Sequence, residues 1–124
     1  MHDAYDYFRF GEYLISIGKH SMAIEYLENA ARLEPRKASI RELLAITYFN
    51  CRNYSKSEEN FKIAIDIDPT NDYAYFGLSR CLYKMGVLYS AISQLKIAIA
   101  LSPDNKMYGD TLAQLIPNKT RELD

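Results

Sequence analysis

Large apolar residues recur along the chain at helical spacing, in segments that come in pairs. In the first segment Tyr7, Phe10 and Leu14 stand three and four residues apart, so a helix would carry all three on one side. In the next segment Ala23 and Leu27 begin a narrower stripe of small and medium-sized residues, which permits close helix packing. The pattern predicts amphipathic helices arranged in antiparallel pairs.

Residues 61–67 read FKIAIDI, and this alternation of isoleucine with other residues is typical of a β-strand. The segment nevertheless leads to a proline that recurs with a period of 34 residues, as Pro35, Pro69 and Pro103. Columns of alanine and leucine fall into the same frame. Because a fixed period of this length is typical of stacked supersecondary units, we predict that residues 61–67 end a helix.

The period divides the chain into three helix-turn-helix units, a closing helix and a tail. Gly18 and Gly86 mark the turn inside the first and third units, and Arg52 stands in the corresponding loop of the second. We predict one all-α domain over residues 1–124. Its parts are three units at about 4–37, 38–71 and 72–105, a capping helix at about 106–116 and a tail at 117–124.

The capping helix is needed because the last face of a helical stack would otherwise be exposed to water. Leu112, Leu115 and Ile116 are the residues that we expect to cover this face.

The aligned columns resemble the tetratricopeptide repeat, whose pattern is W-x2-L-G-x2-Y, then A-x3-F, then P. The second unit departs from the pattern at Arg41, where a large apolar residue is expected, and at Ser57. The resemblance implies a right-handed α-solenoid (an α-α superhelix) whose first helices line a concave groove that binds extended peptides. The residues that carry the match in the first unit are Tyr7, Phe10, Gly11, Leu14, Ala23, Leu27 and Pro35.

If the first helices line a groove, each of them must carry a second row of residues that faces the groove, beside the row that packs against its neighbours. This second stripe is rich in aromatic residues. An exposed apolar patch usually marks an interaction site, and tyrosine suits a half-wet surface. The alternative is that these rings are ordinary half-buried core. The predicted groove residues are Tyr5, Phe8, Glu12, Ile15, Glu42, Ile46, Phe49, Asn50, Tyr73, Phe76, Arg80, Tyr83 and Lys84.

The charges of this stripe are separated along the chain. Glu12 and Glu42 belong to the first two units, whereas Arg80 and Lys84 belong to the third. The arrangement predicts a ligand with a basic part over the first two units and an acidic part over the third, with electrostatics setting its orientation.

Some members of the family clamp the acidic C-terminal tails of chaperones with lysine, asparagine and arginine side chains. The matching places in this chain are Phe8, Glu12, Leu43, Tyr73 and Gly77. None of them supplies the required side chain, so we expect a partner other than a chaperone tail.

Composition narrows the function further. Lysine and arginine number 15 against 16 aspartate and glutamate, so the chain has no basic surplus for nucleic acid. No apolar run is long enough to span a membrane. Cys51 and Cys81 make a poor disulfide framework, and a reduced, cytoplasmic setting is expected. His2 and His20 join no cluster with metal-ligand spacing, and we expect no enzyme activity, cofactor or metal.

Two functional hypotheses remain. In the first, the chain is an adaptor that binds an extended peptide or a partner helix in its aromatic groove. In the second, it is a scaffold that forms homo-oligomers through the groove or through the ends of the solenoid.

Overall fold

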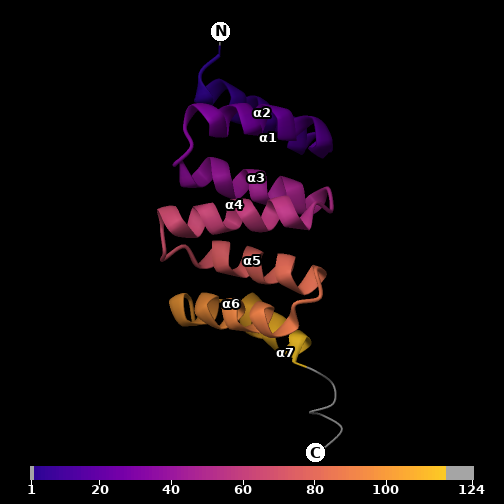
Figure 1. The fold of residues 1–124 in the computed structure, drawn as a ribbon, viewed down its shortest axis with the longest axis vertical. Helices are drawn as coiled ribbons and strands as arrows, with labels where there is room; N and C mark the ends of the chain where they lie inside the picture. The colour runs from indigo at the N-terminus through magenta and orange to yellow at the C-terminus, as the bar shows by residue number, and fades with distance from the viewer. Residues whose placement is uncertain (1, 117–124) are drawn as a thin grey trace, which may run out of the picture.

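The computed structural model describes residues 2–116, and within that range it contains helices and no strand. Met1 and the predicted tail at residues 117–124 lie outside the described residues. Figure 1 shows the helices stacked along the long axis of the molecule. In order they are α1 (Ala4–Ser16), α2 (His20–Leu33), α3 (Ala38–Asn50), α4 (Tyr54–Ile67), α5 (Asp72–Lys84), α6 (Leu88–Leu101) and α7 (Lys106–Leu115).

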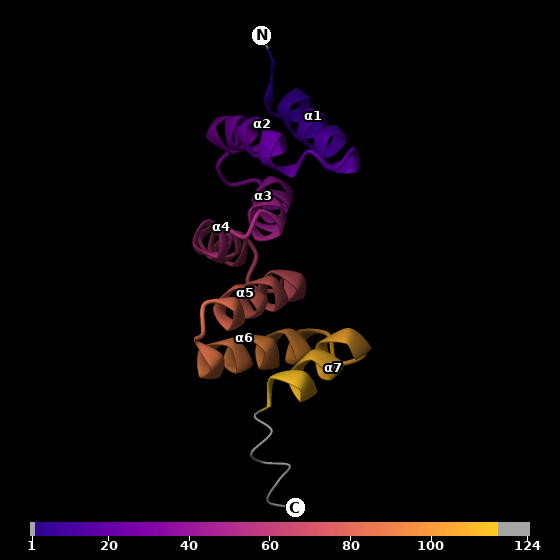
Figure 2. The same cartoon turned by 90° about the vertical axis from the view of Figure 1, so that its right-hand side faces the viewer.

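The helices form three hairpins and a closing helix, as the sequence predicts. The most extensive contacts join α1 to α2, α3 to α4 and α5 to α6, and each hairpin then packs on the next through α2 with α3 and α4 with α5. Figure 2 shows α1 and α3 on one side of the stack and α2 and α4 on the other. The first helices of successive hairpins therefore share one side of the molecule.

The turn inside each hairpin requires one residue with a left-handed backbone. Gly18 and Gly86 adopt φ values of 79° and 82° without a steric cost, whereas Arg52 holds φ at 63° despite its Cβ. Asparagine begins the helices that follow two of the hairpins: the side chains of Asn71 and Asn105 accept hydrogen bonds from backbone amides of α5 and α7.

Small residues determine how closely the helices approach. Ala23, Ala64 and Ala91 are fully buried. At Gly77 a Cβ atom would overlap the ring of Phe61, so α4 and α5 approach more closely than any larger residue at position 77 allows.

Residues 61–67 form the last turns of α4, which confirms the prediction of a helix. Phe61 is buried, and Ile65 packs against the core formed by the second and third hairpins. Packing by neighbouring helices therefore outweighs the β propensity of the isoleucines.

The buried side chains form two clusters that divide within α3. Ile40 and Leu44 belong to the cluster of α1 and α2, whereas Ala45 belongs to the cluster of the second and third hairpins and α7. Helix α3 thus joins the first hairpin to the rest of the stack.

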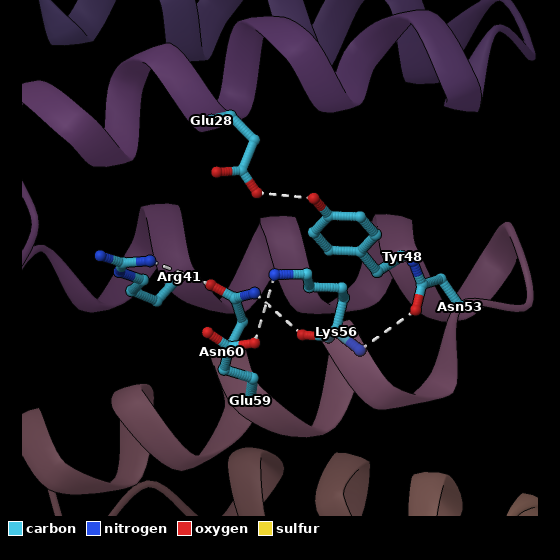
Figure 3. A network of polar contacts seen from close by, with 7 residues as sticks. All are labelled: Glu28, Arg41, Tyr48, Asn53, Lys56, Glu59 and Asn60. Carbon is cyan, nitrogen blue, oxygen red and sulfur yellow. Dashed lines mark hydrogen bonds and ion pairs between the residues drawn. The ribbon is translucent and has the colours of Figure 1, made fainter.

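Arg41, the first departure from the repeat pattern, takes part in a polar network between α3 and α4 (Figure 3). Its Nη1 donates to Oδ1 of the buried Asn60 at 3.1 Å, and its Nε donates to the backbone oxygen of Pro35 at 3.0 Å. Nearby, the Tyr48 hydroxyl donates to Glu28 of α2 at 2.7 Å. Paired polar groups therefore replace the apolar contact that the pattern leads us to expect.

Ser57, the second departure, is also satisfied inside the core. Its hydroxyl donates to the backbone oxygen of Ala45 at 2.7 Å and accepts from the Cys81 thiol at 3.1 Å. The third hairpin contains the reverse arrangement, in which Ser79 of the first helix donates to the backbone oxygen of Ala91 at 2.7 Å. A buried hydroxyl is tolerated at these positions because it has a partner.

Helix α7 covers the last hairpin, although not with all the residues expected. Leu115 is buried and Leu112 is half-buried against the core. The expectation for Ile116 is wrong: it follows the end of α7 and is 38% exposed. Tyr108, which is not among the residues expected to cover this face, is the most deeply buried residue of α7.

Candidate ligand-binding groove

The first helices of the second and third hairpins meet directly, and α7 continues the surface that they form. We call this surface the groove. It is lined by Ile46, Phe49 and Asn50 of α3, Tyr73, Arg80, Tyr83 and Lys84 of α5, and Thr111 and Gln114 of α7. The groove therefore combines aromatic and basic side chains from three helices.

Two hollows lie in the groove on either side of Arg80. The hollow between α3, α4 and α5 measures about 20 Å³, which is little more than a water molecule requires. The hollow between α3, α5 and α7 measures about 230 Å³, enough space for a ligand side chain. The second hollow is therefore the better candidate for ligand contact.

Arg80 is held in place by aromatic rings. The carbon at the centre of its guanidinium group lies 4.3 Å from the ring centroid of Phe49 and 5.8 Å from that of Phe76. Cation–π contact orients the group without neutralising its charge. Lys84 lies one helical turn further along α5. Within residues 2–116 no carboxylate pairs with Arg80 or Lys84, so both cations are available to an anionic ligand.

The two predicted acidic residues already have partners within the chain. Glu12 lies 3.8 Å from the Arg9 guanidinium, and both are exposed. The half-buried Glu42 accepts a hydrogen bond from Nδ2 of Asn71 at 3.0 Å, which connects α3 to the start of α5. Because Glu42 is paired and Glu12 does not line the groove, the charged groups that the groove offers to a ligand are mainly the basic ones.

Phe76 is not an exposed groove residue, and the expectation that it is spare for ligand binding is wrong. It is 5% exposed, and its ring stacks on that of Tyr108 with centroids 4.9 Å apart. The alternative of ordinary core packing holds for this position. By contrast, Tyr83 is 50% exposed at the edge of the larger hollow.

The predicted residues of α1 lie apart from Arg80. Tyr5 and Phe8 line a separate hollow of about 370 Å³ with Lys37 and Ser39, and Ile15 packs against the core of the first hairpin. The structure therefore assembles the α3 and α5 part of the predicted stripe into one surface. The role of all these residues in binding stays a prediction.

Tyr108 could have been found by extending the 34-residue period one step further. It falls in the column of Ile40 and Ala74, which are 2% and 0% exposed. The same extension predicts Gln114 beside Arg80 in the groove column, and Gln114 does line the larger hollow. Nothing in the sequence singles out Thr111 as a groove residue.

Burial changes the proton affinity of several groups near the groove. It raises the pKa of Tyr73, an effect that the positive charge of Arg80 partly opposes. Burial and the hydrogen bond to Asp72 raise the pKa of Tyr108. Burial also raises the pKa of the Cys81 thiol. These groups are therefore neutral near pH 7, and the charge of the groove comes from Arg80 and Lys84.

No helix of the described part of the chain is long and apolar enough to cross a membrane. Over residues 2–116, no three or more histidine, cysteine, aspartate or glutamate side chains gather as metal ligands would.

The sequence profile described as "Tetratricopeptide repeat" matches residues 7–37 and 38–71, which are the first two hairpins. The chain belongs to the tetratricopeptide repeat family. The resemblance noted from the aligned columns is confirmed. The third hairpin continues the same architecture at the same period.

Curated relatives are much longer than this chain. Over 96 residues it is 27% identical to superkiller complex protein 3 of Mus musculus, covering 77% of this chain and 6% of that protein. Over 102 residues it is 29% identical to BBSome complex member BBS4 of Bos taurus, covering 82% of this chain and 20% of that protein. The chain thus spans a small part of the relatives that it matches.

Solved structures share the fold at low sequence identity. The first tetratricopeptide domain of Spaghetti (RPAP3), bound to the HSP90 peptide SRMEEVD, has a TM-score of 0.87 at 18% identity, over 91% of this chain and 90% of that one. YrrB, described as having an unusual peptide-binding site, has a TM-score of 0.86 at 18% identity, over 90% and 57%. MamA has a TM-score of 0.88 at 19% identity, over 97% and 69%. The predicted tetratricopeptide solenoid is confirmed.

Proposed function

We propose that the chain is a non-catalytic protein-interaction module that binds an extended peptide or a partner helix in the groove. The observation that carries the proposal is the pair of cations, Arg80 and Lys84, beside aromatic rings and without carboxylate partners among residues 2–116. Charge-assisted hydrogen bonds to such groups are stronger than neutral ones, particularly where the cation is already oriented.

The ligand that suits this surface is an extended segment with an acidic side chain next to an apolar one. The acidic group would pair with Arg80, whose position over Phe49 leaves its N–H groups able to donate. The apolar side chain would enter the hollow of about 230 Å³ against Tyr83, while Thr111 and Gln114 offer hydrogen bonds to the peptide backbone. Because Glu42 is paired with Asn71 and Glu12 does not line the groove, we expect them to contribute less.

Similar folds with bound peptides support this class of function. Two structures similar to this chain hold HSP90 and HSP70 peptides whose sequences end in EEVD. We propose an acidic segment held at a different place, because the matching positions here cannot supply a clamp. Leu43 packs against the core of the first hairpin, and a side chain at Gly77 would collide with Phe61.

Selection from a phage-displayed library of random peptides tests the proposal. We expect enrichment of sequences that contain Asp or Glu beside an aromatic or aliphatic residue. The variant Arg80→Gln with Lys84→Gln should lose this enrichment while keeping the helical content of the parent protein. Lys62→Gln with Lys96→Gln removes two exposed lysines from α4 and α6 and serves as the matched control.

Two results would overturn the proposal. One is the absence of enrichment on the folded parent protein. The other is enrichment of acidic peptides that the Arg80 and Lys84 variant retains, because these peptides would then bind elsewhere.

A further inference from the structure

The outer side of α1 carries large apolar residues at positions that are buried in the other two hairpins. Phe10 is 47% exposed and Tyr13 is 56% exposed. The residues that stand 34 and 68 positions after Phe10 and Tyr13 are only 0% to 4% exposed. They are Leu44 and Thr47 of α3 and Leu78 and Cys81 of α5.

The difference has a simple cause. The outer side of α3 is covered by α2, and that of α5 is covered by α4. Among residues 2–116 no helix packs on the corresponding side of α1, and Figure 2 shows α1 and α2 at one end of the described stack. This layer presents one half of an inter-repeat interface without its other half.

The exposed side chains form a continuous aromatic surface, which we call the N-terminal face. Phe10 lies 4.6 Å from Tyr26 and 6.1 Å from Tyr13 between ring centroids, and Tyr7 lies 6.5 Å from Tyr26. A shallow hollow of about 840 Å³ lies over them. The remaining residues that line it are His2, Tyr5, Asp6 and Arg9.

The opposite end of the stack is closed differently. Helix α7 buries Tyr108 and Leu115 and carries an exposed ion pair of 3.1 Å between Lys106 and Asp110, although Met107 is 49% exposed. Terminal repeats of a solenoid need a polar outer surface of this kind for solubility. The N-terminal face lacks one, which marks it as a surface that binds another protein.

We propose that the N-terminal faces of two copies of this chain pack against each other about a two-fold axis. A two-fold interface must be complementary to itself. The rim of this face carries both Asp6, which lies 3.8 Å from His2, and Arg9, which lies 3.8 Å from Glu12. Both contacts are exposed and weak, so each acid can face the base of the other copy instead, and the two copies do not repel each other. Because a two-fold pairing occupies the N-terminal face of both copies, it closes as a dimer and does not extend into a filament.

The available area is sufficient for a weak dimer. Aromatic side chains each offer about 150–250 Å². Tyr5, Phe10 and Tyr13, all about half exposed or more, therefore contribute about 350 Å². Ile17 and Met22, at 47% and 53% exposure on the same helical stripes, extend the face to about 500 Å². If all of this area is covered, two copies bury about 1,000 Å², which is the lower limit of a specific interface.

The N-terminal face is separate from the groove, so a dimer would display two grooves at once. A partner with two acidic segments would then bind more tightly than a single segment, because the second contact is intramolecular.

Sedimentation equilibrium over a range of protein concentrations tests the proposal. We expect the parent protein to move from monomer to dimer mass as its concentration rises through the micromolar range. Phe10→Ser with Tyr13→Glu should weaken the dimer at least tenfold. Tyr89→Glu, at an 80% exposed position on α6, and Tyr83→Glu in the groove are matched controls that should leave the dimer unchanged.

Hydrogen exchange of the parent protein at low and high concentration gives a second readout that needs no variant. Concentration-dependent protection should appear in α1 and α2. A protein that stays monomeric overturns the proposal, and so does a dimer that Tyr83→Glu disrupts or whose protection appears in the groove. Masses that grow beyond the dimer would indicate head-to-tail assembly and would also contradict it.

Discussion

The ring of Phe76 lies nearly parallel to the ring of Tyr108, with centroids 4.9 Å apart and planes inclined by 28°. The Tyr108 hydroxyl donates a hydrogen bond of 2.7 Å to Asp72 at the first position of α5. One residue of α7 is thereby attached to α5 by both an apolar and a polar contact. These contacts attach α7 firmly to the last hairpin. Helix α7 in turn forms one wall of the groove.

Phe76→Ala should destabilise the protein by about 3–5 kcal/mol, because it removes a buried ring and leaves a cavity beneath α7. Urea unfolding followed by circular dichroism measures the change. Tyr83→Ala is the matched control on the same helix, and at 50% exposure it should change the free energy of unfolding by no more than about 0.5 kcal/mol. Equal effects of the two substitutions would show that Phe76 is not core.

Stability should fall in alkaline solution because two tyrosines, the buried Tyr108 and the half-buried Tyr48, hold their protons more tightly in the folded protein. Burial, followed by hydrogen bonds to Asp72 and Glu28, raises the pKa of Tyr108 and of Tyr48. Below pH about 10 both tyrosines keep their protons in the folded and unfolded states. Above it only the unfolded chain releases them, so the free energy of unfolding should fall by up to about 1.4 kcal/mol per pH unit for each residue.

Urea unfolding at several pH values measures this slope. Tyr108→Phe and Tyr48→Phe should each reduce it, whereas Tyr89→Phe, at an 80% exposed position, should leave it unchanged. Stability that does not depend on pH between about 9 and 11 contradicts the assignment.

Arg52→Gly should stabilise the protein by up to about 1 kcal/mol. The left-handed conformation at φ 63° costs a residue with a Cβ about 1–2 kcal/mol, and glycine avoids this cost. Glycine also loses more backbone entropy on folding, which offsets part of the gain. Gly86→Ala, the reverse change in the third hairpin, should destabilise by about 1 kcal/mol. Thermal unfolding of the two variants should give shifts of opposite sign, and shifts of the same sign would refute the argument.

Arg41→Leu restores the residue type of the family pattern, yet we expect it to destabilise the protein by about 1–3 kcal/mol. It removes the donor to Oδ1 of Asn60, which is 4% exposed and would lose that partner. Adding Asn60→Leu should recover most of the loss, because both polar groups are then absent. A double-mutant cycle measures this coupling, and additive effects would contradict it.

Much of the fold follows from the sequence because the period of 34 residues fixes which columns pack together. It places residues 61–67 in a helix against their local β propensity. A column of aligned residues does not show whether a further helix packs against it. The repeat pattern therefore does not predict that Phe10 is exposed while Leu44 and Leu78 are buried. For the same reason Phe76 appears spare until α7 places Tyr108 over it. Both differences in burial therefore occur in the first and last hairpins of the described stack, whose neighbours differ from those of the middle hairpin.

The candidate groove was predictable in part. The second stripe of the first helices predicts that α3 and α5 line the groove and that the groove is aromatic and basic. Phe49, Arg80 and Tyr83 do line the same hollow. The contacts that engage Glu12 and Glu42 depend on the side-chain positions of Arg9 and Asn71. Those positions are not encoded in the repeat pattern.

The groove itself is tested most directly by titrating isotopically labelled protein with an acidic peptide enriched in the phage selection and following its backbone amide resonances. We expect the largest changes at Phe49, Arg80, Tyr83 and Gln114. The variant Arg80→Gln with Lys84→Gln should lose at least tenfold in affinity, which corresponds to about 1.4 kcal/mol. Changes centred on α2, α4 and α6, or an affinity unaffected by that variant, would contradict the proposed groove.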